Sequence, residues 1–150
     1  MTPRRCFAVL VLLVLGATSV QAQERSSAGR VKVVSGSAFL VRQGRTIPAT
    51  LDQVVLQSDV LKTGADGRLG VTLNDDTRVS LGPVSEVRVD RFSYAEADGG
   101  MHLVLKFVRG VAAYVSGRIA KLSPDAVRLE TPAAIVGVRG TTLAIRVDAE

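Results

Sequence analysis

The residue types that usually carry catalysis are sparse and scattered in this chain. His102 is the only histidine, and no residue near it in the sequence could complete a catalytic triad or a metal site. Cys6 is the only cysteine and lies close to the N-terminus. Five candidate serines lack the strand–turn–helix setting of a nucleophile elbow; they are Ser35, Ser37, Ser80, Ser85 and Ser116. We therefore expect no catalytic residue, and we interpret His102 as a solvated residue where a strand begins.

Two stretches have residues that could hold an ion or a phosphate group. Asp75 and Asp76 are adjacent carboxylates, but they do not have the spacing of an oxygen-ligand loop such as the EF-hand. We interpret them as part of a solvated hairpin turn. The glycines of 64–67 also mark a turn, and the helix that a phosphate cradle requires does not follow them. We therefore expect neither a metal ion nor a cofactor.

One charged residue lies inside an apolar, β-branched stretch: Arg139, between Gly137 and Gly140. The apolar residues change from even to odd positions across these glycines, from Ala134, Val136 and Val138 to Leu143, Ile145 and Val147. A strand with one buried face can change parity only by an extra residue, and glycine favours such a bulge. We therefore predict a bulge or kink here, with Arg139 donating to unpaired carbonyls or pairing with a carboxylate. Recognition of a partner by Arg139 is the alternative.

The segments that must position these residues have the pattern of β-strands. From Val31 on, valine and leucine alternate with polar residues, and turn residues interrupt them at short intervals. Residues 68–91 form three blocks of eight with valine at the fourth position of each block, namely Val71, Val79 and Val87. The sixth position is aliphatic, and the residue between the two belongs to the opposite face. Each block therefore predicts a short strand whose valine faces one core.

Other alternating segments flank this repeat. They include 103–107 and 111–115, which Arg109-Gly110 separates as an expected tight connection. No apolar stripe is long enough to predict a helix with the 3.6-residue period. About a dozen short strands result, so the fold class is all-β, either a short-stranded β-sandwich or a solenoid-like β-roll.

The N-terminus has the three regions of a secretory signal peptide. Arg4 and Arg5 precede the apolar run Phe7–Leu15, and Val20-Gln21-Ala22 offers a cleavage site. We expect a signal peptide at 1–22, a flexible leader at 23–30 and a β domain at 31–150; an uncleaved anchor is the alternative. Cleavage would remove Cys6, so the mature chain would form no disulfide and keep no membrane span.

The charge pattern argues against nucleic acid as a partner. The chain carries 19 Lys and Arg against 14 Asp and Glu, a formal net charge of +5. The basic residues are scattered singly rather than gathered in runs, and few aromatic residues could stack on bases.

An ordered set of short segments resembles the FecR domain family. The set begins with Gly36 and Leu61–Gly64 and continues through Arg68–Leu73, Val79–Ser85 and Arg109–Val111. It closes with Thr131–Thr141, which is the most specific segment. We take the structural motif of this last segment to be Thr131, Pro132, Gly137, Arg139, Gly140 and Thr141. Where the family usually shows Asp-Gly, this chain has Asp75-Asp76-Thr77.

The resemblance implies a β-rich, non-catalytic, extracytoplasmic domain of the bacterial envelope. Full regulators of this family relay a signal from an outer-membrane transporter to a cytoplasmic sigma factor. Few residues precede the apolar run and none follow Glu150, so we expect a stand-alone exported domain, periplasmic or secreted. It would act as a protein-interaction or signalling module with an envelope protein as partner. A structural or matrix-associated envelope protein without a signalling role is the alternative.

Overall fold

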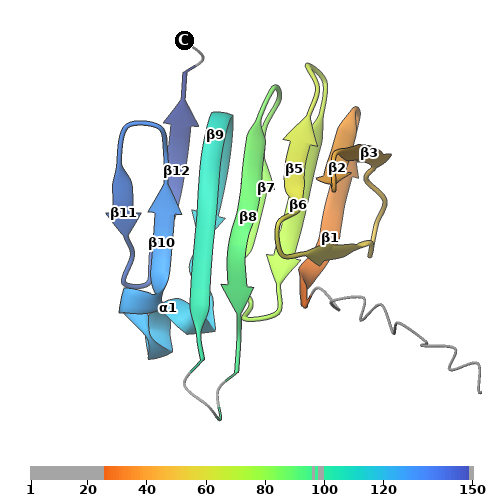
Figure 1. Cartoon of the computed structure of the whole chain (residues 1–150). Coiled ribbons are helices and arrows are strands. Elements are labelled where there is room, and N and C mark those ends of the chain that lie inside the picture. Colours follow the sequence, from red (N-terminus) through yellow and green to blue (C-terminus); the bar gives the residue numbers. More distant parts are fainter. Residues whose placement is uncertain (1–25, 96, 98–99, 149–150) are drawn as a thin grey trace, which may run out of the picture.

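The computed structural model describes residues 26–95, 97 and 100–148. The predicted signal peptide at 1–22 therefore lies outside the described residues, as do the first residues of the predicted leader. Within the described part the chain folds mainly into β-strands, with one short helix and one 3₁₀ turn packed at one end (Figure 1). The all-β prediction is confirmed.

Twelve strands are present in the described residues. The strands before the central repeat are β1 (Ser27–Ser35), β2 (Ala38–Arg42), β3 (Arg45–Pro48), β4 (Val54–Leu56) and β5 (Val60–Thr63). The repeat forms β6 (Arg68–Leu73), β7 (Arg78–Leu81) and β8 (Glu86–Ser93). The remaining elements are β9 (His102–Val115), α1 (Arg118–Leu122), η1 (Pro124–Ala126), β10 (Val127–Glu130), β11 (Ile135–Gly137) and β12 (Thr142–Val147).

The strands form one curled sheet in the order β3-β2-β5-β8-β9-β7-β6-β1-β4. The sheet has two halves, and the long strand β9 belongs to both. The first part of β9 pairs with β8 and β10, and its second part pairs with β7 and β12. We call β1, β4, β6, β7, β12 and the second part of β9 half-sheet A, and the other strands half-sheet B. The two halves share one core, as in a sandwich and unlike a stacked solenoid.

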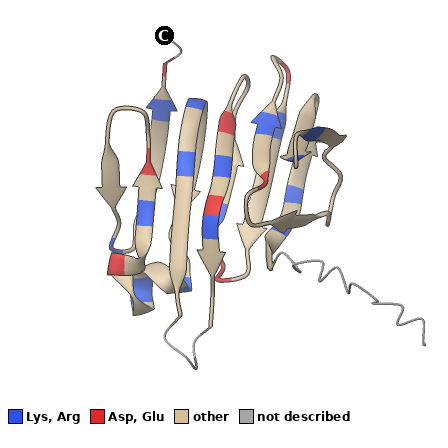
Figure 2. Ribbon diagram, in the orientation of Figure 1, with Lys and Arg blue, Asp and Glu red and all other residues tan. Residues whose placement is uncertain are grey.

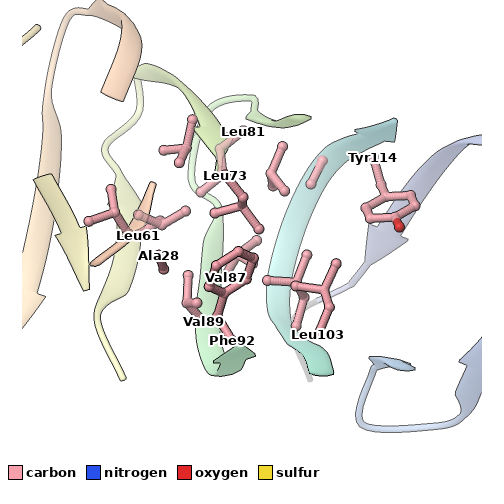
Figure 3. Close-up of a cluster of buried hydrophobic side chains, with 14 of the residues drawn as sticks. Ala28, Leu61, Leu73, Leu81, Val87, Val89, Phe92, Leu103 and Tyr114 are labelled. Atoms are coloured by element: carbon pink, nitrogen blue, oxygen red, sulfur yellow. The ribbon is translucent and has the colours of Figure 1, made fainter. Parts of the chain in front are cut away.

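The valine repeat faces this core as predicted. Val71, Val79 and Val87 are at most 2% exposed, whereas Ser80 and Arg88 on the opposite face are exposed. Figure 3 shows Val87 of β8 among the same buried side chains as residues of β6 and β7. The three strands are not three neighbours, however, because β9 lies between β7 and β8. The repeat is therefore divided between the two half-sheets.

The segment Arg109-Gly110 is not the tight connection that the sequence suggested. Strand β9 continues through it, and the buried side chains change from odd positions before it to Ala112 and Tyr114 after it. The register against β8 shifts between Phe107 and Arg109, which inserts the extra residue that a change of face requires. Val111, Ala113 and Val115 therefore lie on the outer face rather than in the core.

The boundary of the leader also needs correction. Strand β1 begins at Ser27, and Ala28 is fully buried. A Cβ atom on Gly29 would lie 2.3 Å from the carbonyl oxygen of Thr72 on β6. Small residues here permit close packing of two strands, so they indicate a strand and not a flexible segment.

The helix α1 was not predicted, because five residues are too few for a helical period in the sequence. Ile119 and Ala120 of this helix are buried against the core. Within the described residues no helix is long and apolar enough to cross a membrane.

Candidate functional site

Three segments of the sequence resemblance meet where the sheet bends. The hydroxyl of Thr63 donates to the carbonyl of Gly82 (2.7 Å) and accepts from the backbone N–H of Ser85 (2.9 Å). The hydroxyl of Ser85 in turn lies 3.0 Å from the carbonyl oxygen of Val111 and 2.9 Å from its backbone nitrogen. Ser85 is therefore a buried residue whose hydroxyl connects two strand segments. We call this group of contacts the bend cluster.

Position 110 requires glycine for two reasons, which are its backbone conformation and the lack of space beside the bend cluster. Its φ is +86°, and a Cβ atom on it would lie 2.3 Å from the hydroxyl oxygen of Ser85. Only glycine meets both conditions without strain. The Arg109-Gly110-Val111 segment of the resemblance thus has a structural explanation.

Asp75 is not the solvated turn residue that the sequence suggested. It is fully buried, and its carboxylate accepts hydrogen bonds from the backbone N–H and the hydroxyl of Thr77 and from the backbone N–H of Ile119. Its backbone carbonyl accepts from Arg118 (2.7 Å), and a Cβ atom on Gly117 would clash with that carbonyl. The β6–β7 turn therefore fastens the start of α1. The donors that surround the Asp75 carboxylate, from Thr77 and Ile119, thus stabilise the fold.

A second buried carboxylate also has a structural partner. Asp59 accepts two hydrogen bonds from the Arg42 guanidinium, at 2.9 and 2.7 Å, and a third from the backbone N–H of Leu56. The hydrogen bond to Asp59 raises the pKa of Arg42 above its ordinary value. Arg42 donates as well to the carbonyl of Val54, so the pair fastens β4 to half-sheet B.

His102 opens β9, as the sequence indicated, and it is partly exposed opposite Ser93 of β8. Its neighbours around a shallow depression include Arg91, Asp125 and Arg128. Among the described residues, no three or more His, Cys, Asp or Glu side chains gather where they could hold a metal ion.

The most specific segment of the resemblance, Thr131–Thr141, lies at the surface. We call it the motif segment. It begins as the tight turn between β10 and β11, where the N–H of Thr131 donates to the carbonyl of Ala134 (2.8 Å) and the N–H of Ala134 donates to the Thr131 hydroxyl (3.0 Å). Pro132 lies inside this turn, where its fixed φ is favourable. Thr131 and Pro132 therefore shape the hairpin.

The strand that follows the turn is unusually exposed. Ile135 is 66% exposed and Val136 is 41% exposed, although both are apolar. Strand β11 pairs with β10 only, so its other edge has no neighbouring strand among the described residues. Figure 1 shows β11 at the margin of the sheet. An exposed apolar edge is a template for another strand.

The region of Gly137 to Gly140 is a connection rather than a bulge within one strand. Val138 is buried, and the chain then passes from β11 of half-sheet B to β12 of half-sheet A. A Cβ atom on either Gly137 or Gly140 would meet nothing within 4 Å. The two glycines differ in that Gly140 alone has a positive φ, of +73°. The parity changes because two strands of different half-sheets are involved.

Arg139 and Thr141 differ in their surroundings. Arg139 is exposed and forms neither a hydrogen bond nor an ion pair with any residue that the structure describes. No contact thus matches the expected role of Arg139 in satisfying carbonyls or a carboxylate. Thr141 exchanges hydrogen bonds with Ser116 at the end of β9, at 2.8 and 3.0 Å, and so fixes the start of β12.

Two depressions border the motif segment. One, of about 420 Å³, is lined by Thr131 and Pro132 together with Arg109, Arg146 and other residues of β9 and β12. The other, of about 530 Å³, is lined by Ile135, Arg139 and Arg128 among others. The sequence did not identify Val136 as a surface residue, since its alternation with Val138 suggested burial, and it did not single out Ile135. The proline before β11 and the glycine at its end were the available signals of a short edge strand.

Comparison with known proteins supports the resemblance. Residues 59–150, more than half of the chain, match a family model described as FecR protein. No curated protein matches the chain, and no solved structure does so either.

Proposed function

Because the chain belongs to the FecR protein family, we propose that it is a non-catalytic protein-interaction module of the bacterial cell envelope. In this proposal it is exported and acts in the periplasm or outside the cell. Its partner is an envelope protein, which it contacts through the motif segment.

The observation that carries the proposal is the free edge of β11. This edge offers Ile135 and Val136 to the surface, in the middle of the segment that most specifically marks the family resemblance. A residue kept for folding would be expected to face the core or to form hydrogen bonds, as Thr131 and Thr141 do. Ile135 does neither, and an exposed apolar residue on a sheet edge favours contact with another chain.

The backbone of β11 supports docking by addition of a strand. The hydrogen bond from Thr131 to Ala134 closes the hairpin, and hydrogen-bonded pairs alternate along antiparallel strands. Val136 therefore directs its N–H toward β10, while Ile135 and Gly137 direct theirs away from it. An extended segment of a partner could accept these two donors.

Crosslinking in living cells tests the proposal. A photo-crosslinking amino acid at position 135 should capture a defined envelope protein. The matched control is position 51, because Leu51 is 65% exposed but lies in the turn before β4. Capture of the same proteins from both positions, or of none from position 135, would contradict docking at β11.

Two substitutions separate the backbone from the side chain. Ile135→Pro removes both the outward N–H and the side chain, whereas Ile135→Ala removes most of the side chain alone. We expect a larger loss of capture with proline, and melting temperatures close to the parent for alanine because the site is exposed. Arg139→Ala should likewise melt like the parent, and weaker capture by this variant would assign Arg139 to recognition.

A further inference from the structure

The outer face of half-sheet A carries positive charge without negative charge. Strands β1, β6, β7 and β12 place five exposed cations on this face, namely Arg30, Lys32, Arg68, Arg78 and Arg146. Half-sheet A has no Asp or Glu within any of its strands. The acidic residues that lie within strands are all on β8 and β10 of half-sheet B, where Figure 2 shows red bands. The strands of half-sheet B carry eight Lys and Arg against Glu86, Asp90 and Glu130, so the two half-sheets have the same net charge. Half-sheet A differs in having no carboxylate within its strands between its cations.

Three of these cations have no partner within the described residues. Asp52 forms an ion pair with Lys32 (2.9 Å), and its carbonyl accepts a hydrogen bond from Arg30. Arg68, Arg78 and Arg146 form neither a hydrogen bond nor an ion pair. Their guanidinium groups are thus available for an anion outside this chain.

The nearest carboxylates on adjacent turns are occupied elsewhere. Asp66 accepts a hydrogen bond from the backbone N–H of Ser37. Hydrogen bonding to the side chain of Ser37 and to this N–H holds the pKa of Asp66 below its ordinary value. Asp76 pairs with Arg118 at 3.1 Å. The carboxylates of Asp66, of Asp76 and, after β12, of Asp148 lie near this face, but none of them forms a hydrogen bond or an ion pair with the three arginines.

Of these arginines, Arg68 lines a shallow depression of about 370 Å³ on this face, and the strand register places the other two beyond its lining. Arg68 and Arg146 lie on one row across the strands, three strand spacings apart, which corresponds to about 14 Å. Arg78 lies on another row, the one that pairs Thr72 with β7, about 13 Å along the strands from Arg68. Small residues cover the floor between them, where Gly70, Ser80 and Ala113 lie opposite one another. An extended chain can therefore lie across the strands within reach of all three guanidinium groups.

The side chains of this face favour one class of anionic ligand over the others. Its outward residues include no aromatic side chain on which nucleic-acid bases could stack. A peptide strand binds sheet edges, where backbone groups are free, and a sheet face offers none. Val33 and Val111 are the large apolar side chains exposed there, too few to insert into a lipid layer. A linear polymer that carries separate carboxylates matches this face, because each guanidinium group can pair with one carboxylate through two parallel hydrogen bonds.

We propose that the outer face of half-sheet A binds a linear acidic polysaccharide that carries carboxylates, with Arg68, Arg78 and Arg146 as its ligands. The three arginines lie on β6, β7 and β12 and not on β11, so the proposal goes beyond the protein-interaction function. Arg146 also lines the depression beside Thr131 and Pro132, so the two surfaces adjoin. An envelope protein that binds both would link a protein partner to a charged surface polymer.

Binding of the purified protein to polygalacturonate, a linear polyuronate, tests the proposal by calorimetry at low salt. Neutral dextran of similar length is the control polymer. We expect binding to polygalacturonate and none to dextran. The triple variant Arg68→Gln, Arg78→Gln, Arg146→Gln should bind at least about tenfold more weakly. Since these side chains are exposed and unpaired, the variant should melt like the parent.

The matched control removes three exposed cations from half-sheet B, through Arg45→Gln, Arg91→Gln and Lys106→Gln. This variant should lose less than about threefold in affinity, because only the distant field of the protein changes. Equal losses in the two triple variants would overturn the site, and so would absence of binding to polygalacturonate. Binding to vesicles of anionic phospholipid that equals binding to polygalacturonate, and depends on the same arginines, would show a membrane surface instead. Capture at position 135 is independent of all these results.

Discussion

Gly110 shows at the scale of one residue why the sheet bends where it does. Its positive φ turns the course of β9, and the missing side chain lets Val84 and Ser85 approach its backbone. Arg109 beside it pairs with Glu86 at 3.5 Å, which keeps β9 against β8 on one side of the bend. A change of face within one strand thus depends on a single glycine.

Gly110→Ala should therefore destabilise the protein strongly. The new Cβ atom would lie 2.3 Å from the Ser85 hydroxyl oxygen, and overpacking of this kind costs about 1 to 3 kcal/mol in addition to the strain of a positive φ. Gly44→Ala is the matched control, since Gly44 has φ +74° but open space around it. Thermal melts should show a loss for Gly44→Ala of roughly 1 kcal/mol and a clearly larger loss for Gly110→Ala. Equal shifts would mean that contact with Ser85 is unimportant.

At the scale of elements, α1 depends on a turn that is more than forty residues away in the sequence. A helix of five residues has too few hydrogen bonds to be stable alone. The buried carboxylate of Asp75 compensates by accepting the N–H of Ile119, and the hydroxyl of Thr77 accepts the N–H of Gly117. The hairpin β6–β7 and the start of α1 therefore form one unit.

Asp75→Ala should release this unit. The N–H groups of Thr77 and Ile119 would lose their acceptor inside the protein, at a cost of about 1 to 3 kcal/mol for each buried donor. Hydrogen exchange at Ile119 should accelerate together with a lower melting temperature. Asp76→Asn is the control, because asparagine tolerates the positive φ of 68° at this position and the change removes only the exposed ion pair with Arg118, at a cost of no more than about 1 kcal/mol. Unchanged exchange in Asp75→Ala would refute the fastening role of this turn.

At the scale of the whole molecule, the fold extends beyond the part that matches the family. The match begins at Asp59, yet Val31, Leu40 and Val55 are fully buried in the same core as residues after it. Strand β1 pairs with β6 and strand β2 pairs with β5. Residues 27–58 thus complete both half-sheets instead of forming a separate domain.

A substitution before Asp59 should therefore destabilise the whole molecule. Leu40→Ala should cost about 2 to 5 kcal/mol and shift a single unfolding transition, because it leaves a cavity in the shared core. Leu51→Ala, at an exposed leucine of the same region, should stay within about 0.5 kcal/mol of the parent. A second transition that appears only in Leu40→Ala would indicate that residues 27–58 unfold separately, contrary to a single core.

Local patterns determined much of this molecule. The period of two in the repeat predicted which face of β6, β7 and β8 is buried, since neighbouring side chains of a strand point to opposite faces wherever the strand lies. The residues of the motif segment predicted the family without any knowledge of contacts. Thr131 and Pro132 act on their own neighbours in the chain, so the turn between β10 and β11 was within reach of the sequence, although it was not predicted.

Partners distant in the sequence decided the rest. Asp75 looks like an ordinary turn residue until α1 is packed on it, and the outward parity of Val111 follows from the register of β9 against β8. The exposure of Ile135 depends on which strands flank β11, and the charge of half-sheet A depends on which strands lie side by side. The sequence of each strand determines its period and its side-chain chemistry, but the pairing between strands depends on contacts that are distant in the sequence and on the packing of the whole core.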